Sequence, residues 1–167
     1  MISALRGFEA SLARLRLDYV DLLLIHWPLP VRDLYLDTWR AFIRLQADGL
    51  VRSIGVSNFL PHQMERLVTE TGVWPVVNQV EIHPYFSQRD LRDWHLKHNV
   101  VSQSWSPIGA GMGLLDESTV RRIAGNHGRT PAQVVLRWHL QLGAAPIPKS
   151  ADAAHEGELR CLRLLSV

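Results

Sequence analysis

The chain has 167 residues, of which 47% are hydrophobic and 20% are charged, and its net charge is +2 at neutral pH. This composition is typical of one soluble globular domain and excludes a disordered or fibrous protein. The small, interspersed charge gives no reason to expect a nucleic-acid or membrane partner. A single cysteine, Cys161, excludes an internal disulfide, and the sequence shows no membrane-length apolar run and no secretory signal. We therefore expect a cytoplasmic protein.

The first predicted strand is an apolar run that begins at Asp18 and ends on His26. The strand stops there because Pro28 cannot donate a ladder hydrogen bond and biases Trp27 toward an extended conformation. Apolar residues occupy both alternating faces of the run, so we expect both faces of the strand to be covered. His26 then lies at the carboxyl end of a buried strand, where α/β proteins place their ligands.

A helix is expected before this strand, and helical and strand patterns alternate after it. The expected elements are a helix at 34–47, a strand at 51–56, a helix at 61–71, a strand at 76–80, a helix at 88–98, a strand at 100–105, helices at 116–127 and 131–142, and a strand at 144–147. Alternation of this kind predicts βαβ units and a parallel sheet of five strands. The apolar stripe of the 34–47 helix consists of Leu36, Trp39, Phe42 and Ile43.

Polar and aromatic residues follow the end of every predicted strand. This series favours a (β/α) barrel, whose site is assembled from the loops at the carboxyl ends of its strands. A doubly wound sheet is the competing fold, but no G-x-G-x-x-G motif follows the first strand. A complete barrel takes eight strands and about 250 residues, so the chain is expected to supply five of the eight.

Several motifs in this order and spacing resemble the aldo-keto reductases, in particular the bacterial 2,5-diketo-gluconate reductase branch. They are Asp18-Tyr-Val-Asp with Ile-His-Trp-Pro, Gly55-Val-Ser-Asn-Phe, Val77-Asn-Gln-Val-Glu, Trp105-Ser-Pro, Gly128-Arg-Thr-Pro-Ala-Gln and Ile147-Pro-Lys-Ser. The resemblance implies a partial (β/α)8 TIM barrel over residues 1–152, comprising strands 4 to 8 and their helices. Residues 153–167 depart from the family pattern, and we hypothesise that a frameshift produced this tail.

The resemblance also implies an activity. In this family a hydride from NADPH reduces an aldehyde or ketone to an alcohol, and a Tyr acid acts with a Lys, an Asp and a His. His26 matches that histidine and would orient the carbonyl oxygen, and Trp27 would line the substrate pocket. The matching Asp, Tyr and Lys would precede the first helix, and Tyr19 and Tyr35 match other positions. The alternative function is therefore a catalytically inactive, cofactor-binding remnant. Full-length relatives are expected to be monomeric.

The cofactor implied by the resemblance is NADP(H). Ser57, Asn58 and Gln79 match the residues that hold the nicotinamide carboxamide, and Trp105 matches the aromatic residue that stacks on the ring. The pyrophosphate region, where glycines let backbone N–H groups approach phosphate, is matched by Ser106, Pro107, Ile108, Gly109 and Gly111. Lys149 and Ser150 match the contacts to the 2′-phosphate, which favour NADP over NAD.

Taken without the motif series, most of these residues have simpler interpretations. A lone His26 would more often be a structural histidine, and the glycine loop an ordinary turn. Glu81 could act as a general base or as a partner of nearby backbone. His95 and His98 are predicted to lie on a solvated helix face, and no metal site is expected. Arg121 and Arg122 are also assigned to a solvated face, and Trp39, Trp74, Trp94 and Trp138 to helix packing.

Overall fold

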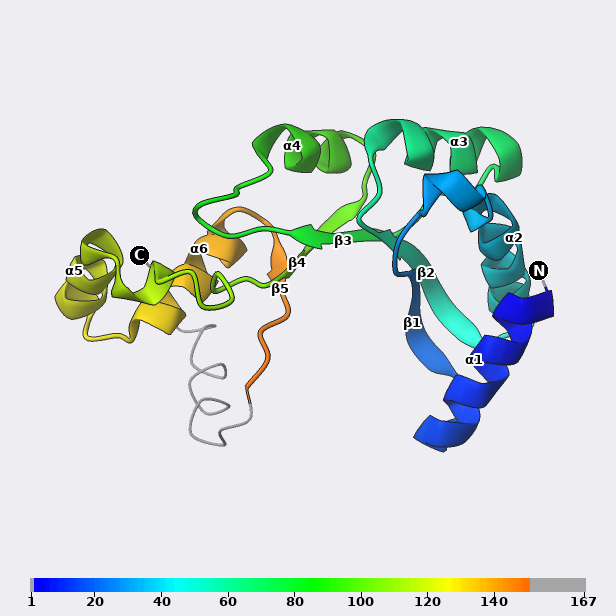
Figure 1. Cartoon of the computed structure of the whole chain (residues 1–167), viewed down its shortest axis with the longest axis horizontal. Helices are drawn as coiled ribbons and strands as arrows, with labels where there is room; N and C mark the ends of the chain where they lie inside the picture. The colour runs from blue at the N-terminus through cyan, green and yellow to red at the C-terminus, as the bar shows by residue number, and fades with distance from the viewer. Residues whose placement is uncertain (1, 151–167) are drawn as a thin grey trace. The chain divides into compact units, whose positions relative to one another are not determined.

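The computed structural model describes residues 2–150 and shows an α/β fold (Figure 1). Its strands form one sheet in chain order: β1 (Val20–Ile25), β2 (Val51–Ser57), β3 (Val77–Glu81), β4 (Val101–Trp105) and β5 (Ala145–Pro146). β1 pairs with β2, β2 with β3, and β4 with β5, all in parallel. The predicted parallel α/β sheet is confirmed. The predicted tail 153–167 lies outside the described residues.

Six α-helices and two short 3-10 helices connect these strands within residues 2–150. They are α1 (Ile2–Leu15), η1 (Pro30–Arg32), α2 (Tyr35–Ala47), α3 (Pro61–Thr71), α4 (Arg89–Lys97), η2 (Leu114–Asp116), α5 (Ser118–His127) and α6 (Pro131–Gln141). The start of α6 shows why the predicted bounds agree closely with the observed ones. Thr130 accepts a hydrogen bond from the Gln133 amide at 3.2 Å, and the Gln133 side chain accepts one from the Thr130 amide at 3.1 Å. This capping box, with Pro131 in the first turn, can be recognised in the sequence.

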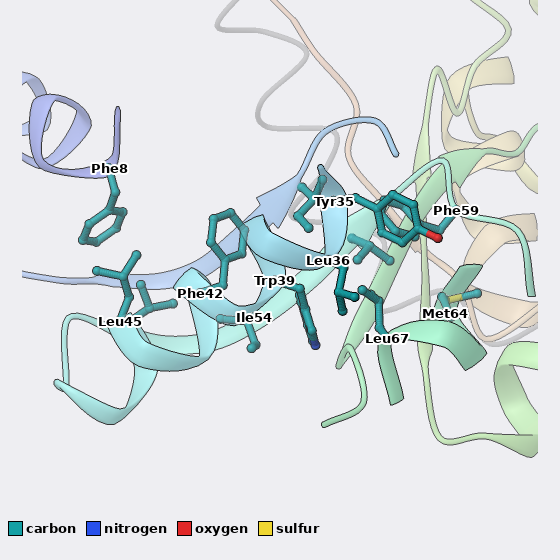
Figure 2. Packing of buried hydrophobic residues seen from close by; sticks show 13 residues of the cluster. Phe8, Tyr35, Leu36, Trp39, Phe42, Leu45, Ile54, Phe59, Met64 and Leu67 are labelled. Carbon is teal, nitrogen blue, oxygen red and sulfur yellow. The ribbon is translucent and has the colours of Figure 1, made fainter. Parts of the chain in front are cut away.

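The chain divides into two compact units. Among the described residues, the first comprises 2–79 and 90–101, and the second comprises 80–89 and 102–150. The core of the first unit forms where α2 packs on β1 and β2 and contacts α1 and α3 (Figure 2). Its buried side chains are Phe8, Ile25, Tyr35, Leu36, Trp39, Phe42, Leu45, Val51, Ile54, Val56, Phe59, Met64 and Leu67. Leu36, Trp39 and Phe42 of the predicted α2 stripe are therefore confirmed as core, and Ile43 packs against this core while partly buried.

β1 is less buried than its sequence predicts. Val20, Leu23 and Ile25 pack against the core, whereas Asp21 and Leu22 are exposed, Leu22 by 37%. In the described part of the chain β1 has one strand neighbour, β2, and the core lies on one side of it. Asp21 and Leu22 are consecutive and point to opposite faces of the sheet, so neither face of β1 is covered along its whole length, and the expectation of two covered faces is wrong here.

The histidines of α4 also differ from expectation. His95 is fully buried, and its Nε2 lies 3.0 Å from Nδ2 of Asn78. Burial, together with the positive charge of nearby His98, lowers the pKa of His95 to about 4. His98 stacks on Trp74 and Trp94, with ring centroids 5.0 and 4.1 Å away. The prediction of a solvated histidine face is wrong, because His95 is buried against Asn78 of β3 and His98 is stacked between two tryptophan rings.

None of the helices within residues 2–150 is both long and apolar enough to span a bilayer. Within the same residues, no group of three or more His, Cys, Asp and Glu side chains is placed to bind a metal ion.

Candidate cofactor-binding and active site

The carboxyl ends of β1, β2 and β3 meet in a hydrogen-bonded cluster in the first unit. The Ser57 hydroxyl donates to the Gln79 carbonyl at 2.7 Å, and the Asn58 amide N–H donates to the same oxygen at 2.9 Å. The Asn58 side chain donates to Ser57 Oγ and to the His26 carbonyl, both at 3.1 Å. Four of the predicted site residues, His26, Ser57, Asn58 and Gln79, are thus brought together.

Strand register explains why these residues meet. Ile25 pairs with Val56, and Ser57 pairs with Gln79, so the ends of β1 and β2 lie beside Gln79, two residues before β3 ends. Gly55 permits this register because a Cβ at that position would lie 2.8 Å from the Val77 carbonyl oxygen. Any larger residue at position 55 would push the strands apart.

A buried amide fixes the turn that follows β2. Asn58 adopts a left-handed conformation with φ of 62°, which asparagine tolerates better than most residues. Behind it, Asn78 donates to the Phe59 carbonyl at 2.8 Å and accepts from the Phe59 amide at 3.3 Å. Asn78 and Phe59 are both fully buried. The exposed side of the turn is therefore held by a rigid inner layer, which sequence reasoning did not identify.

His26 and Trp27 lie just beyond β1. His26 is exposed, its backbone is tied to Asn58, and its ring centroid is 6.2 Å from that of Trp27. Trp27 is 50% exposed. Both side chains can therefore contact a ligand at the carboxyl edge of the first unit.

The second unit contains the predicted pyrophosphate loop after β4. Five of its residues have positive φ, and they are Ser106, Gly109, Ala110, Gly111 and Gly113. Gly109 has φ of 79°, and a Cβ there would lie 3.1 Å from Leu114. Within this loop the Gly109 amide donates to the Ser106 carbonyl and the Met112 amide to the Gly109 carbonyl, both at 2.9 Å, so the positive φ values belong to successive tight turns.

A buried histidine anchors the start of this loop. His139 Nε2 lies 2.9 Å from the Pro107 carbonyl, and its Nδ1 lies 3.1 Å from Ser104 Oγ. Because a carbonyl only accepts, Nε2 carries the proton and Nδ1 accepts from the serine. His139 and Ser104 are fully buried. The sequence offered no signal for this pair, because the two residues lie 35 positions apart on different elements.

A cavity of about 420 Å³ lies within the second unit, a size suited to a small-molecule ligand. Its lining includes three predicted cofactor residues, Ile108, Lys149 and Ser150. The remaining lining residues are Leu115, Asp116, Arg121, Thr130, Pro131, Ala132, Leu136 and Pro148.

The charges in this cavity favour an anion. Arg121 and Asp116 both line the cavity and form an ion pair with each other. Lys149 adds a second positive charge, so the charged lining residues give the cavity a net charge of +1. Arg121 is exposed as predicted, and it also lines the cavity. The sequence could not indicate this, because the helical pattern of α5 shows only that Arg121 faces outward.

A hydrogen bond between Tyr85 and Glu117 lies at the far end of the loop that follows β4. The Tyr85 hydroxyl donates to Glu117 Oε1 at 2.6 Å, and this hydrogen bond to a carboxylate raises the pKa of Tyr85. Glu117 lies between η2 and α5. Nearby, Glu81 lies beside a histidine rather than beside backbone, with Oε1 at 3.4 Å from His83 Nε2.

A model of the aldo/keto reductase family matches residues 3–158. The chain belongs to the aldo/keto reductase family. It is 48% identical over 153 residues to the methylglyoxal reductase DkgA of Salmonella typhimurium, covering 91% of this chain and 56% of that protein. It is 52% identical over 155 residues to 2,5-diketo-D-gluconic acid reductase B of a Corynebacterium species, covering 93% and 56%. The predicted family and branch are thus confirmed, and the chain spans about half the length of these relatives.

Solved structures of aldo/keto reductases have the same fold. An aldo/keto reductase from Brucella melitensis matches with a TM-score of 0.90 at 49% identity, covering 96% of this chain and 61% of that one. A variant of Gox0644 in complex with NADPH matches with a TM-score of 0.95 at 47% identity, covering 99% and 60%. The described fold therefore corresponds to part of the barrel of this family, as predicted.

Proposed function

We propose that this chain forms the cofactor-binding part of an NADP-dependent carbonyl reductase that acts on small aldehydes or ketones. When bound, the cofactor would supply a hydride to the carbonyl carbon. The observation that supports the proposal most strongly is the cluster of His26, Ser57, Asn58 and Gln79 at the ends of three neighbouring strands. Two of the relatives have names that describe carbonyl reduction.

The residues of each unit fit one part of the cofactor. In the first unit the hydroxyl of Ser57 and the amides of Asn58 and Gln79 have the chemistry to hold a carboxamide. In the second unit Trp105 offers an aromatic face at the end of β4, and the positive-φ loop from Ser106 offers backbone amides to a pyrophosphate. Lys149 and Ser150 border a cavity of net positive charge, which suits a 2′-phosphate.

The chemical step assigns distinct roles to the two residues after β1. His26 would donate a hydrogen bond to the carbonyl oxygen, which stabilises the negative charge that develops there. Trp27 would pack against the carbon side of the substrate. The acid, lysine and aspartate that the family resemblance implies are not matched within these 167 residues. We therefore expect the 167 residues alone to bind NADPH without measurable turnover.

Titration of the chain with NADPH, followed by tryptophan fluorescence, tests the proposal with matched variants. Asn58→Gly removes the side chain but keeps the left-handed backbone, and Asn99→Gly does the same at a second left-handed asparagine with φ of 56°. We expect only Asn58→Gly to weaken NADPH binding, by roughly three- to tenfold for lost hydrogen bonds. Equal effects of the two variants would contradict the proposed nicotinamide site.

The cavity in the second unit has its own matched pair. Lys149→Met should weaken NADPH binding by roughly tenfold, because it removes a charge from the proposed phosphate site. Lys97, on α4, is the only other lysine in the sequence, and Lys97→Met should leave the affinity unchanged. An unchanged NADPH affinity in Lys149→Met would show that this cavity does not hold the 2′-phosphate.

A further inference from the structure

An arginine on α3 ties down the segment that follows β1. Arg66 Nη2 donates to Asp33 Oδ2 at 3.1 Å, and Arg66 Nη1 contacts Asp33 Oδ1. The same Nη1 donates to the Tyr35 hydroxyl at 3.0 Å, and the guanidinium carbon lies 5.2 Å from the centre of the Tyr35 ring. We call these three residues the Arg66 clasp. A two-donor contact to one carboxylate fixes orientation as well as distance.

The segment that the clasp holds, residues 27–34, has few other anchors, namely the buried ring of Pro28 and two hydrogen bonds of 3.0 Å from the Thr38 amide and hydroxyl to the Leu34 carbonyl. Leu29 and Asp33 have positive φ of 42° and 46°, and such conformations persist only where the surroundings enforce them. Trp27, Leu29 and Val31 are half or more exposed, so their packing contributes little. Two backbone hydrogen bonds, from the amides of residues 32 and 33, lie within the segment itself.

At its other end the clasp reaches the nicotinamide side of the site. The Tyr35 ring is buried and packs edge-on against Phe59, with centroids 5.5 Å apart and planes at 89°. In Figure 2 the two rings overlap in the view, at the end of the core that faces the turn after β2. Phe59 directly follows Asn58, and its backbone is bonded on both sides to Asn78. Continuous contacts therefore join Asp33 to the turn that carries Asn58.

We propose that Arg66 is a positioning residue that acts through Asp33 and Tyr35 to fix residues 27–34, and with them Trp27, relative to Asn58. The inference rests on the proposed function, in which Trp27 lines the carbonyl pocket and Asn58 holds the nicotinamide. Arg66 itself touches neither ligand. The clasp sets the shape of the substrate side of the site while leaving the cofactor contacts in place.

The chain contains a chemically matched control for this clasp. Arg52 Nη1 donates to Asp21 Oδ1 at 2.7 Å, and its guanidinium carbon lies 4.4 Å from the centre of the Tyr19 ring. This second arginine also joins an aspartate and a tyrosine, but at the start of β1 and β2, away from their carboxyl ends. Loss of a surface ion pair alone should therefore have similar effects at the two sites.

The test compares Arg66→Met with Arg52→Met in the 167-residue chain labelled with 5-fluorotryptophan. Trp27→Phe assigns the Trp27 fluorine resonance among those of the six tryptophans. We expect Arg66→Met to shift the Trp27 fluorine resonance and to speed hydrogen exchange of the amides of residues 32 and 33 by roughly three- to tenfold. The expected increase in the exchange rate is no larger than this because the Arg66–Asp33 pair is exposed to solvent. Arg52→Met should change neither. Arg66→Lys keeps the charge but lacks the planar fork, so it should behave like Arg66→Met.

Two results would overturn the inference. One is an unchanged Trp27 resonance and unchanged exchange in Arg66→Met, and the other is the same change in Arg52→Met. If Arg66→Met does not fold, Arg66→Lys and Asp33→Asn give the same comparison. Neither measurement needs a ligand, so a chain that fails to bind NADPH would refute the proposed function and still leave the clasp tested.

Discussion

Replacement of Asn78 by alanine should be among the most damaging single changes in the first unit. The Asn78 side chain is fully buried and makes three polar contacts: with the Phe59 amide, with the Phe59 carbonyl and with His95 Nε2. Each lost contact is worth about 1 kcal/mol, and the partners stay buried without a replacement. We therefore expect Asn78→Ala to lower the free energy of unfolding by about 3 kcal/mol. This is a large part of the total free energy of unfolding of a typical domain, which is about 5–15 kcal/mol.

Thermal and urea unfolding followed by circular dichroism measure this loss. For a chain of this size about 3 kcal/mol corresponds to a fall in Tm of roughly 10 °C. Asn126→Ala is the matched control, because Asn126 is exposed on α5, and it should change the free energy of unfolding by less than about 0.5 kcal/mol. If Asn78→Ala costs no more than Asn126→Ala, the inner layer does not support the Asn58 turn in the way argued above.

Three further predictions follow from the buried histidines and the tyrosine contact. The folded chain resists protonation of His95, so the free energy of unfolding should fall by up to about 3 kcal/mol as the pH is lowered from 6.5 to about 4. In His95→Gln this fall in the free energy of unfolding over the same pH range should be absent. Glu117→Gln should lower the pKa at which Tyr85 ionises, seen as phenolate absorbance at a lower pH, and an unchanged titration would refute the contact. His139→Ala should cost about 2 kcal/mol in urea unfolding by leaving Ser104 and the Pro107 carbonyl unpaired, and a loss below about 0.5 kcal/mol would contradict this.

Local patterns were sufficient to place the elements and the strand ends. Pro61 and Pro131 mark the first turns of two helices. Pro28 stops the first strand, so the sequence predicts that His26 lies at the carboxyl end of β1. Parallel strands of similar length then bring their carboxyl ends to one level. The meeting of Ser57, Asn58 and Gln79 could therefore be predicted, whereas their roles toward a cofactor stay predictions.

Contacts between distant residues could not be read from those patterns. His95 has polar neighbours on α4 and looks exposed, but its partner Asn78 lies 17 residues away on β3. Arg66 lies 33 residues from Asp33, and nothing in either local sequence indicates the other. The exposure of Asp21 and Leu22 in β1 has the same origin, because burial of a strand depends on which elements cover it and not on its own apolar content.

The most direct test of the proposed function is the ratio of the NADH and NADPH dissociation constants for the unmodified 167-residue chain. Fluorescence titration with each nucleotide under identical ionic strength measures both. The positively charged cavity at Lys149 predicts that NADPH binds at least roughly tenfold more tightly than NADH, since only NADPH carries the 2′-phosphate. Equal affinities, or no binding of either nucleotide by the folded chain, would contradict the proposed function.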